Sequence, residues 1–236
     1  MGEVIVAALG GSLIKLNEQD KCEKWIRDLA KCMLELNSRG FKVGIVIGGG
    51  IVARQAISSV KNIITDSELL DNIGISATRL NATLIQQVFN YSGIDTNKKI
   101  PIDIESATKL LEQHPVVVMG GTVSGQTTDT VAVELSNSVN AKRCVIATNV
   151  SHVYDKDPRM NDDAKIIESI SLKDLGIISG VGKKLEAGSS KVVDPIAIER
   201  AIEGHMPLCV VNGWELEQFM AAMNGGDFNG TNVTVD

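Results

Sequence analysis

PVVVMGGTVSGQTTD, residues 115–129, decides which fold this chain adopts. It opens with a short run of apolar side chains, the pattern of a strand that is covered on both faces. The run ends in Gly120 and Gly121, and a helical pattern, VAVELSNSV, begins soon after Asp129. A strand, a glycine turn and a hydroxyl-rich helix N-terminus favour anion binding, because the first N–H groups of a helix are unpaired. The alternative interpretation is a purely structural connection.

The same design occurs twice earlier in the chain. VIVAAL at 4–9 runs into Gly10-Gly11-Ser12, and VGIVI at 43–47 runs into Gly48-Gly49-Gly50. Each apolar run ends in glycines at its C-terminal end, which is where open parallel sheets bind their ligands. Three such turns in register predict a large polyanion lying across the strand ends.

Composition sets limits on fold and partners. The chain has 236 residues, 44% of them hydrophobic, which suits one large α/β domain or two lobes. Its net charge of −6 and aromatic content of 3% count against a nucleic-acid partner, since a basic surface and stacking rings are both scarce. Its four cysteines are scattered, which favours buried thiols over metal ligands or disulfides. Without a membrane-length apolar stretch or a signal peptide, we expect a cytoplasmic protein with no membrane partner.

The rest of the chain alternates between helical and strand patterns. Helices are predicted near residues 25–36, 52–60, 66–92, 104–113, 195–203 and 214–223, and further strands at 144–148, 207–211 and 228–235. We expect the last strand at a sheet edge, and we expect residues 176–190 to be too rich in glycine for a stable helix. Alternation of this kind predicts an α/β protein, a three-layer αβα sandwich with a mostly parallel central sheet.

Three charged residues are candidates for a cleft. Arg54 falls in the first turn of the helix after Gly50, where a cation gains nothing from the helix dipole. An external anion explains that position better, and a surface salt bridge is the alternative. Asp71 and Arg79 belong to the long helix at 66–92, but periodicity alone does not place them.

These motifs, in this order, resemble the amino acid kinase superfamily, and most closely its archaeal-type uridylate kinases, over nearly the whole chain. The likeness is carried by GGS at 10–12, GGGxxAR at 48–54, GGTxxGQTTD at 120–129 and TNVxxVYxxDP at 148–158, with AGSSxVVDPxA at 187–197 and Asn229-Gly-Thr in support. The resemblance implies an αβα sandwich, a homohexamer, and Mg²⁺-dependent transfer of the γ-phosphoryl group of ATP to UMP. It also implies one kinase domain over 1–236, with an acceptor-side lobe at about 1–140 and an ATP-side lobe at about 141–236.

Carried over position by position, the resemblance divides the candidate site into two sides. ATP would contact Gly10, Gly11, Ser12, Gly50, Arg54, Thr148, Asn149, Tyr154 and Asp157. UMP would contact Gly49, Asp71, Thr122, Val123, Ser124, Gly125, Gln126, Thr127 and Thr128. No residue is assigned as a metal ligand, so Mg²⁺ is expected to arrive with ATP.

The chain departs from the superfamily pattern at two places. Many members have a lysine two residues before the GGS turn, where this chain has Ala8. Lys15, Lys183 or Lys184 could replace it, and we predict Lys184, with Arg54, as a catalytic cation. The second departure is Ser151-His152, where the family usually has Asp-Gly; His152 is interpreted as a surface histidine in an altered loop.

Two alternative functions stay open. One is another phosphotransferase of the superfamily, although no histidine lies beside the GGG turn as in isopentenyl phosphate kinases, and the loops of carbamate and amino-acid kinases match GQTTD poorly. The other is a homologue that binds a nucleotide or oxyanion without catalysis, which Ala8 keeps open.

Overall fold

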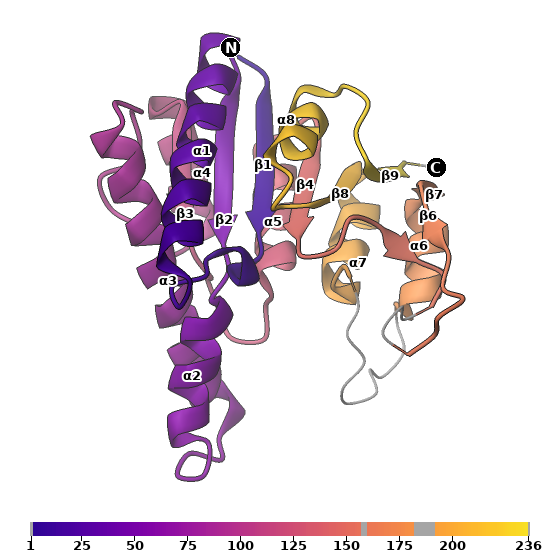
Figure 1. The fold of residues 1–236 in the computed structure, drawn as a ribbon, viewed down its shortest axis with the longest axis horizontal. Helices are drawn as coiled ribbons and strands as arrows, with labels where there is room; N and C mark the ends of the chain where they lie inside the picture. The colour runs from indigo at the N-terminus through magenta and orange to yellow at the C-terminus, as the bar shows by residue number, and fades with distance from the viewer. Residues whose placement is uncertain (1, 157–159, 182–191, 236) are drawn as a thin grey trace.

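The computed structural model describes residues 2–156, 160–181 and 192–235. Within them a seven-stranded sheet has the order β3-β2-β1-β4-β8-β9-β7 (Figure 1). Its strands are β1 Val4–Leu9, β2 Lys42–Ile47, β3 Val116–Met119, β4 Cys144–Thr148, β7 Ser169–Ser171, β8 Leu208–Asn212 and β9 Gly230–Thr234. A separate small sheet pairs β5, Val153–Tyr154, with β6, Ile166–Ile167.

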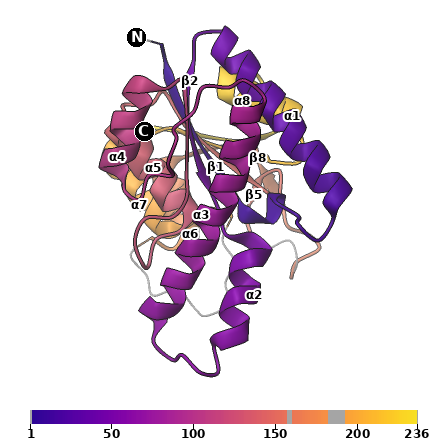
Figure 2. The same ribbon diagram turned by 90° about the vertical axis from the view of Figure 1, so that its left-hand side faces the viewer.

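Helices cover both faces of the main sheet (Figures 1 and 2). They are α1 Gln19–Ser38, α2 Gly50–Val60, α3 Ser67–Tyr91, α4 Ile104–Gln113, α5 Thr128–Ser138, α6 Leu172–Ser179, α7 Pro195–Gly204 and α8 Leu216–Asn224, with a short 3-10 helix at Gly11–Leu13. Alternate strand residues supply the two cores, because successive side chains point to opposite faces. Ile5 and Ile45 pack with α1, α3 and α8, whereas Val6 and Val46 pack with α4, α5, α6 and α7. This confirms the three-layer sandwich.

The sheet is mostly parallel, as predicted, with one exception. β2 pairs with β1 and β3, β4 pairs with β1 and β8, and β7 pairs with β9, all in parallel. β9 runs antiparallel to β8 and lies between β8 and β7, so the prediction of an edge strand at 228–235 was wrong. The edge next to β9 is taken by β7, a strand too short to stand out in the sequence.

The helix α6 corrects a second prediction. Gly176 lies inside this helix, although residues 176–190 were expected to be unable to form one. The helix forms because it packs on α7; a Cβ atom at Gly176 would make only an ordinary van der Waals contact, 3.4 Å, with Ile202 in that helix. α6 ends at Gly180, which has a left-handed φ of 73°. Residues 182–190 lie outside the described part of the chain.

Helices α2 and α3 form a projection below the sheet (Figure 2). α3 begins at Asp66, whose side chain accepts hydrogen bonds from the N–H groups of Glu68 and Leu69. Its C-terminal half packs Ala82, Ile85 and Phe89 into the core, but its N-terminal half packs against α2, which has no buried residue. In the described parts of the chain, no helix is long and apolar enough to cross a membrane.

Candidate active site

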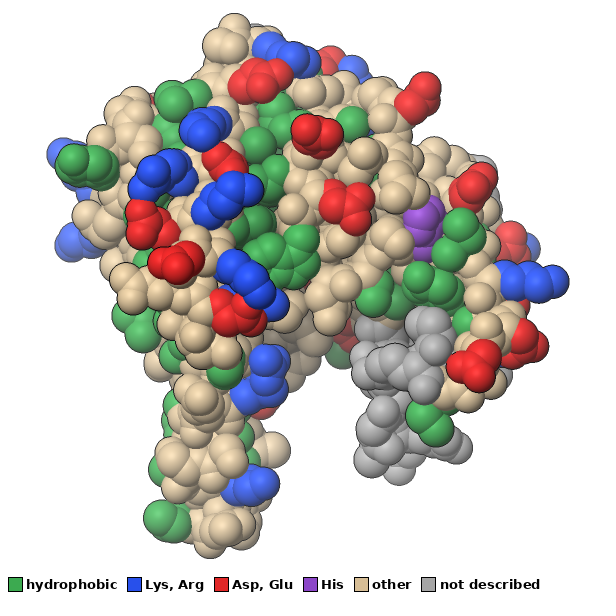
Figure 3. Space-filling view, in the orientation of Figure 1, with side chains coloured by type: hydrophobic (Ala, Val, Ile, Leu, Met, Phe, Trp, Pro, Cys, Tyr) green, Lys and Arg blue, Asp and Glu red, His purple; other side chains and the backbone are tan. Residues whose placement is uncertain are grey.

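The carboxyl ends of the parallel strands meet at one edge of the sheet. β2 follows β1 on one side and β4 lies on the other, so the chain reverses its strand order at β1. Such a reversal leaves a crevice at the strand ends, where open α/β sheets bind ligands. The arrowheads of β1, β2 and β4 point toward a notch between the α2–α3 projection and the part that carries α6 and α7 (Figures 1 and 3). This notch is the candidate site.

The first two glycine turns are packed backbone against backbone. A Cβ atom at Gly11 would lie 2.1 Å from the nitrogen of Gly50, and one at Gly50 would lie 2.0 Å from the oxygen of Gly11. Gly50 also has a φ of 56°, a conformation that favours glycine. No other residue type fits either position without moving the chain, so the structure brings these two predicted turns into direct contact.

The third turn reaches the same place from β3. A Cβ atom at Gly48 would lie 3.0 Å from Oγ1 of Thr128, which begins α5. Gly120 packs against α3, since a Cβ atom there would lie 2.7 Å from Oγ1 of Thr78. That hydroxyl accepts a hydrogen bond of 2.6 Å from the N–H of Gly121. The three glycine turns therefore converge, as their register in the sequence predicts.

Residues 122–128, called the acceptor loop below, are held by their own polar side chains and by α3. Oδ2 of Asp71 accepts hydrogen bonds from the Ser124 hydroxyl at 2.8 Å and the Gly125 N–H at 2.9 Å. Gln126 accepts from the Thr122 hydroxyl at 2.7 Å and donates to Glu134 at 2.9 Å. The structure thus brings Asp71 together with this loop. Val123 at its tip is exposed.

Arg79 fastens the start of the acceptor loop. Its guanidinium donates to the backbone oxygens of Gly121 at 3.1 Å and Thr122 at 3.2 Å, and to that of Ile102 at 3.4 Å. These acceptors are neutral, and among the described residues no carboxylate pairs with Arg79 beside the third turn. Periodicity could not place this residue; the structure places it at the cleft.

Two carboxylates lie behind the N-terminus of α5. Oδ2 of Asp194 accepts hydrogen bonds from the hydroxyls of Thr127 at 2.8 Å and Thr130 at 2.6 Å. Oδ2 of Asp129 accepts a long one, 3.4 Å, from the N–H of Asp194. Loss of hydration raises the pKa of Asp129 to about 7; the Asp194 N–H opposes this shift, and the Asp194 carboxylate adds to it. Asp129 therefore exchanges a proton near neutral pH.

Arg54 and the lysine candidates have different surroundings. Arg54 is exposed, and no carboxylate pairs with it in the described part of the chain. Ala8, at the position where many superfamily members have a lysine, is buried in the core that includes α5. Lys15 pairs with Glu18 at 3.0 Å and lies 4.9 Å above the Trp214 ring. The predictions for Lys183, Lys184 and Asp157 concern positions outside the described residues.

The ATP-side residues that the structure describes lie at the end of β4 and beyond it. The N–H of Gly10 donates to the oxygen of Ala147 at 2.9 Å, which joins the first turn to this strand end. Thr148 donates to the side-chain oxygen of Asn149 at 3.3 Å, and Ser12 lies in the 3-10 helix after Gly11. Tyr154 lies further along, in the small sheet. Thr148 and Asn149 are therefore close to the first turn, and Tyr154 belongs to a separate element.

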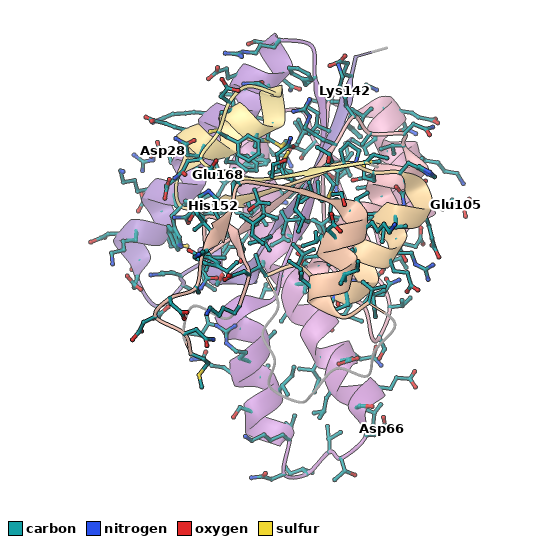
Figure 4. The ribbon with its side chains drawn as sticks, turned by 90° about the vertical axis from the view of Figure 1, so that its right-hand side faces the viewer. Asp28, Asp66, Glu105, Lys142, His152 and Glu168 are labelled. Atoms are coloured by element: carbon teal, nitrogen blue, oxygen red, sulfur yellow. The ribbon has the colours of Figure 1, made fainter. Side chains whose placement is uncertain are left out.

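His152 is not the surface residue that was predicted. It is buried, and its Nδ1 lies 2.9 Å from the Ser151 hydroxyl. It lines a hollow together with Glu168 and Phe228. His152 and Glu168 are labelled in Figure 4. The neighbouring Val153 N–H donates to Oγ1 of Thr231 at 2.8 Å, which ties this segment to β9.

Sequence reasoning missed the polar residues of α3 that hold the turns. Thr78 binds Gly121, and the buried Asn81 donates to the backbone oxygens of Gly48 and Gly49. A polar residue on the buried face of an amphipathic helix is the signal that could have found Asn81. Asp129 stood within the GQTTD motif, but nothing in the sequence showed that it would be withdrawn from water.

The residues present fit a magnesium ion that arrives with a nucleotide. Across residues 2–156, 160–181 and 192–235, no group of three or more His, Cys, Asp or Glu side chains is arranged to hold a metal. Mg²⁺ bound to nucleotide phosphates needs no such group, since one or two carboxylates and waters complete its shell. Asp129, in the first turn of α5, and Asp194, which accepts from Thr127 and Thr130, are carboxylates at the N-terminus of this helix.

Comparison with known proteins agrees with this geometry. Residues 3–212 match the model of the amino acid kinase family. A uridylate kinase from Methanococcus maripaludis strain C5 is 39% identical over 230 residues, 98% of this chain and 99% of its own. One from Methanocaldococcus jannaschii is 39% identical over 228 residues, 96% of this chain and 97% of its own.

Solved structures give the same answer. The uridylate kinase from Archaeoglobus fulgidus superimposes with a TM-score of 0.85 at 32% identity, covering 99% of this chain and all of the other. The UMP kinase from Bacillus anthracis reaches a TM-score of 0.77 at 21% identity over 99% of this chain and 96% of its own, which supports the fold alone. Fold, converging glycine turns and sequence agree that this chain belongs to the amino acid kinase family.

Proposed function

We propose that this protein is a uridylate kinase, which transfers the γ-phosphoryl group of ATP to UMP and releases ADP and UDP. The observation that carries the proposal is the convergence of three glycine turns beside an acceptor loop that Asp71 holds. The relatives that share 39% of their residues with nearly the whole chain bear the name uridylate kinase, and so does a solved structure with a TM-score of 0.85.

The residue types suit a reaction between two phosphates. The phosphate of UMP is already ionised, so the attacking oxygen needs no strong general base. Catalysis then consists of holding the two phosphates in line and neutralising the charge that spreads over the transferred group. In this proposal the N–H groups of the glycine turns bind the phosphates, and Arg54, which has no carboxylate partner among the described residues, supplies charge.

Magnesium would enter with ATP and neutralise charge on its phosphates. The third turn and the hydroxyl of Thr128 would hold the UMP phosphate at the N-terminus of α5, where the helix dipole favours an anion. The second oxygen of Asp71 would accept from a ribose hydroxyl, since only its Oδ2 is used by the loop. Lys184 stays a candidate catalytic cation.

The proposal divides the single domain between the substrates. An acceptor-side lobe at about 1–140 carries the first three glycine turns, Asp71 and the acceptor loop, and an ATP-side lobe at about 141–236 begins with the strand end at Thr148 and Asn149. We further infer a cytoplasmic homohexamer by family resemblance. Chromatography with light scattering tests the assembly.

The test of function is an acceptor screen with Mg-ATP. UMP is expected to be preferred over AMP and GMP by at least about tenfold in kcat/KM, or about 1.4 kcal/mol. Equal use of the purine monophosphates would contradict the assignment. Ala8, which leaves the site one lysine short of many superfamily members, favours one rival, a homologue that binds nucleotides without catalysis. Binding of labelled nucleotide without UMP-dependent ADP release would support that rival.

A further inference from the structure

We propose that Asn81 is a positioning residue for phosphoryl transfer, which orients the peptide groups of the Gly48-Gly49-Gly50 turn toward the nucleotide phosphates. The proposal rests on the uridylate kinase function and adds a residue outside every motif named above. Asn81 does not reach the substrates in this scheme; it acts through the turn.

The carboxamide of Asn81 bonds to two successive peptide groups. Its Nδ2 donates to the backbone oxygen of Gly48 at 2.8 Å and to that of Gly49 at 3.1 Å. Carbonyl oxygens only accept hydrogen bonds, so the nitrogen end of the amide must face them. Both of its hydrogens are used on the turn.

The Gly49 oxygen also accepts from the Ala53 N–H at 3.2 Å, so Asn81 reinforces that peptide group and is the side chain that holds the Gly48 oxygen. Fixing these two oxygens fixes the direction of two N–H groups. In a trans peptide the C=O and the following N–H point in opposite directions. With the oxygens of Gly48 and Gly49 turned toward α3, the N–H groups of Gly49 and Gly50 point away from it. No acceptor within the described residues is bonded to either group. They lie at the N-terminus of α2, where unpaired N–H groups and the helix dipole attract anions.

Packing alone does not account for an asparagine at this position. Asn81 is 1% exposed, and its neighbours on the buried face of α3 are the apolar Ala77, Ala82 and Ile85. Its Oδ1 is buried and has no hydrogen-bond partner in the part of the chain that the structure describes. An unpaired buried oxygen is unfavourable, and an apolar side chain of similar size would avoid it. The two bonds to the turn are what the amide contributes.

The experiment compares Asn81→Leu with a matched control, Gln86→Leu. Gln86 is also buried on α3, and its amide also donates to a backbone oxygen, but that oxygen belongs to Asn97 rather than to the turn. Each variant removes one buried amide. Leucine has the same number of side-chain heavy atoms as asparagine and one fewer than glutamine, so the control is the more severe change to packing. Steady-state kinetics with UMP and Mg-ATP are measured well below both melting temperatures.

We expect Asn81→Leu to lower kcat about 10- to 100-fold, the cost of misplacing groups around a reacting phosphate, with both KM values within about threefold. Gln86→Leu should lower Tm by a comparable amount and keep kcat within about twofold of wild type. If Asn81→Leu did not fold, Asn81→Ala would be measured in its place.

Two results would overturn this inference while leaving the proposed function intact. One is an Asn81 variant with the same kcat as Gln86→Leu. The other is failure of both Asn81 variants to fold, which would show that Asn81 is needed for folding. A wild-type enzyme without UMP-dependent ADP release is a distinguishable outcome, because it removes the proposed function first and this inference with it.

Discussion

The glycine turns of this protein are held in two different ways. The turns at the ends of β1 and β2 press backbone against backbone, with Gly11 and Gly50 so close that neither has room for a Cβ atom. The turn at the end of β3 packs on α3 instead, against the backbone of Arg79 and the side chains of Thr78 and Arg79. Asn81 of the same helix also bonds to the second turn. The first two turns therefore have no room for a side chain where they meet, whereas the position of the third turn depends on side chains of α3.

The strongest test of this comparison is Gly11→Ala. Its Cβ atom would lie 2.1 Å from the nitrogen of Gly50, so the two turns must separate. The Gly50 backbone cannot move aside as a flexible side chain can. We therefore expect kcat/KM to fall at least about 10³-fold, about 4 kcal/mol in transition-state binding. Gly226→Ala is the control, because its nearest contact would be an ordinary 3.7 Å. Equal activities of the two variants would show that the close contact is unimportant.

Arg54→Ala tests whether the transferred phosphoryl group lies at the first two glycine turns, beside Arg54. Arg54 is exposed and has no carboxylate partner in the described residues. If its charge stabilises the transition state, kcat should fall about 10²-fold, or about 2.7 kcal/mol. Arg39→Ala, which removes an exposed arginine paired with Glu35, serves as the control and should keep its kcat. Unchanged kinetics in Arg54→Ala would return Arg54 to the role of a surface residue.

Asp129→Asn tests whether the Asp129 carboxyl is buried at the start of α5, beside the third turn. The test is the pH dependence of stability. The folded state holds the Asp129 proton up to a pKa of about 7, while an unfolded aspartate loses it near 3.8. The folded protein therefore binds more protons between these values, and its free energy of unfolding falls as pH rises through this window. With some exposure remaining, we expect a loss of about 2 kcal/mol, half of what a full three-unit shift would give. Denaturant unfolding at pH 4.5 and 7.5 measures this, and the loss should be absent in Asp129→Asn. Equal pH dependence in the two proteins would contradict the assignment.

The smallest effects separate the two substrates. Asp71→Ala should raise the KM for UMP about tenfold, about 1.4 kcal/mol, because it loses a ribose acceptor and frees Ser124 and Gly125. Asn149→Ala at the end of β4 should instead raise the KM for ATP. In each case the other KM should stay within a few-fold, and direct binding should be measured too, since KM need not equal Kd. If both variants weakened both substrates equally, the division into two sides would be wrong.

Much of the fold was readable from local patterns. The apolar runs before each glycine turn became β1, β2 and β3, and the periodic stretch at 104–113 became α4 with the same bounds. Burial of a strand on both faces and an amphipathic helix each leave a mark within a few residues, so the sequence carries them directly. The three turns could be predicted to converge because carboxyl ends of parallel strands share one edge.

What the sequence determined by itself was the longer strands and helices and the three glycine turns; the tertiary structure decided the short elements and what each element touches. β9 became an interior strand because β7 pairs with it, and α6 formed despite Gly176 because the helix packs on α7. His152 turned inward, and Asn81 met a turn 32 residues earlier in the chain. Each of these depends on contacts between distant segments. Hydrogen bonds and packing across such distances leave no local period in the sequence, since the partner is selected only when the chain has folded.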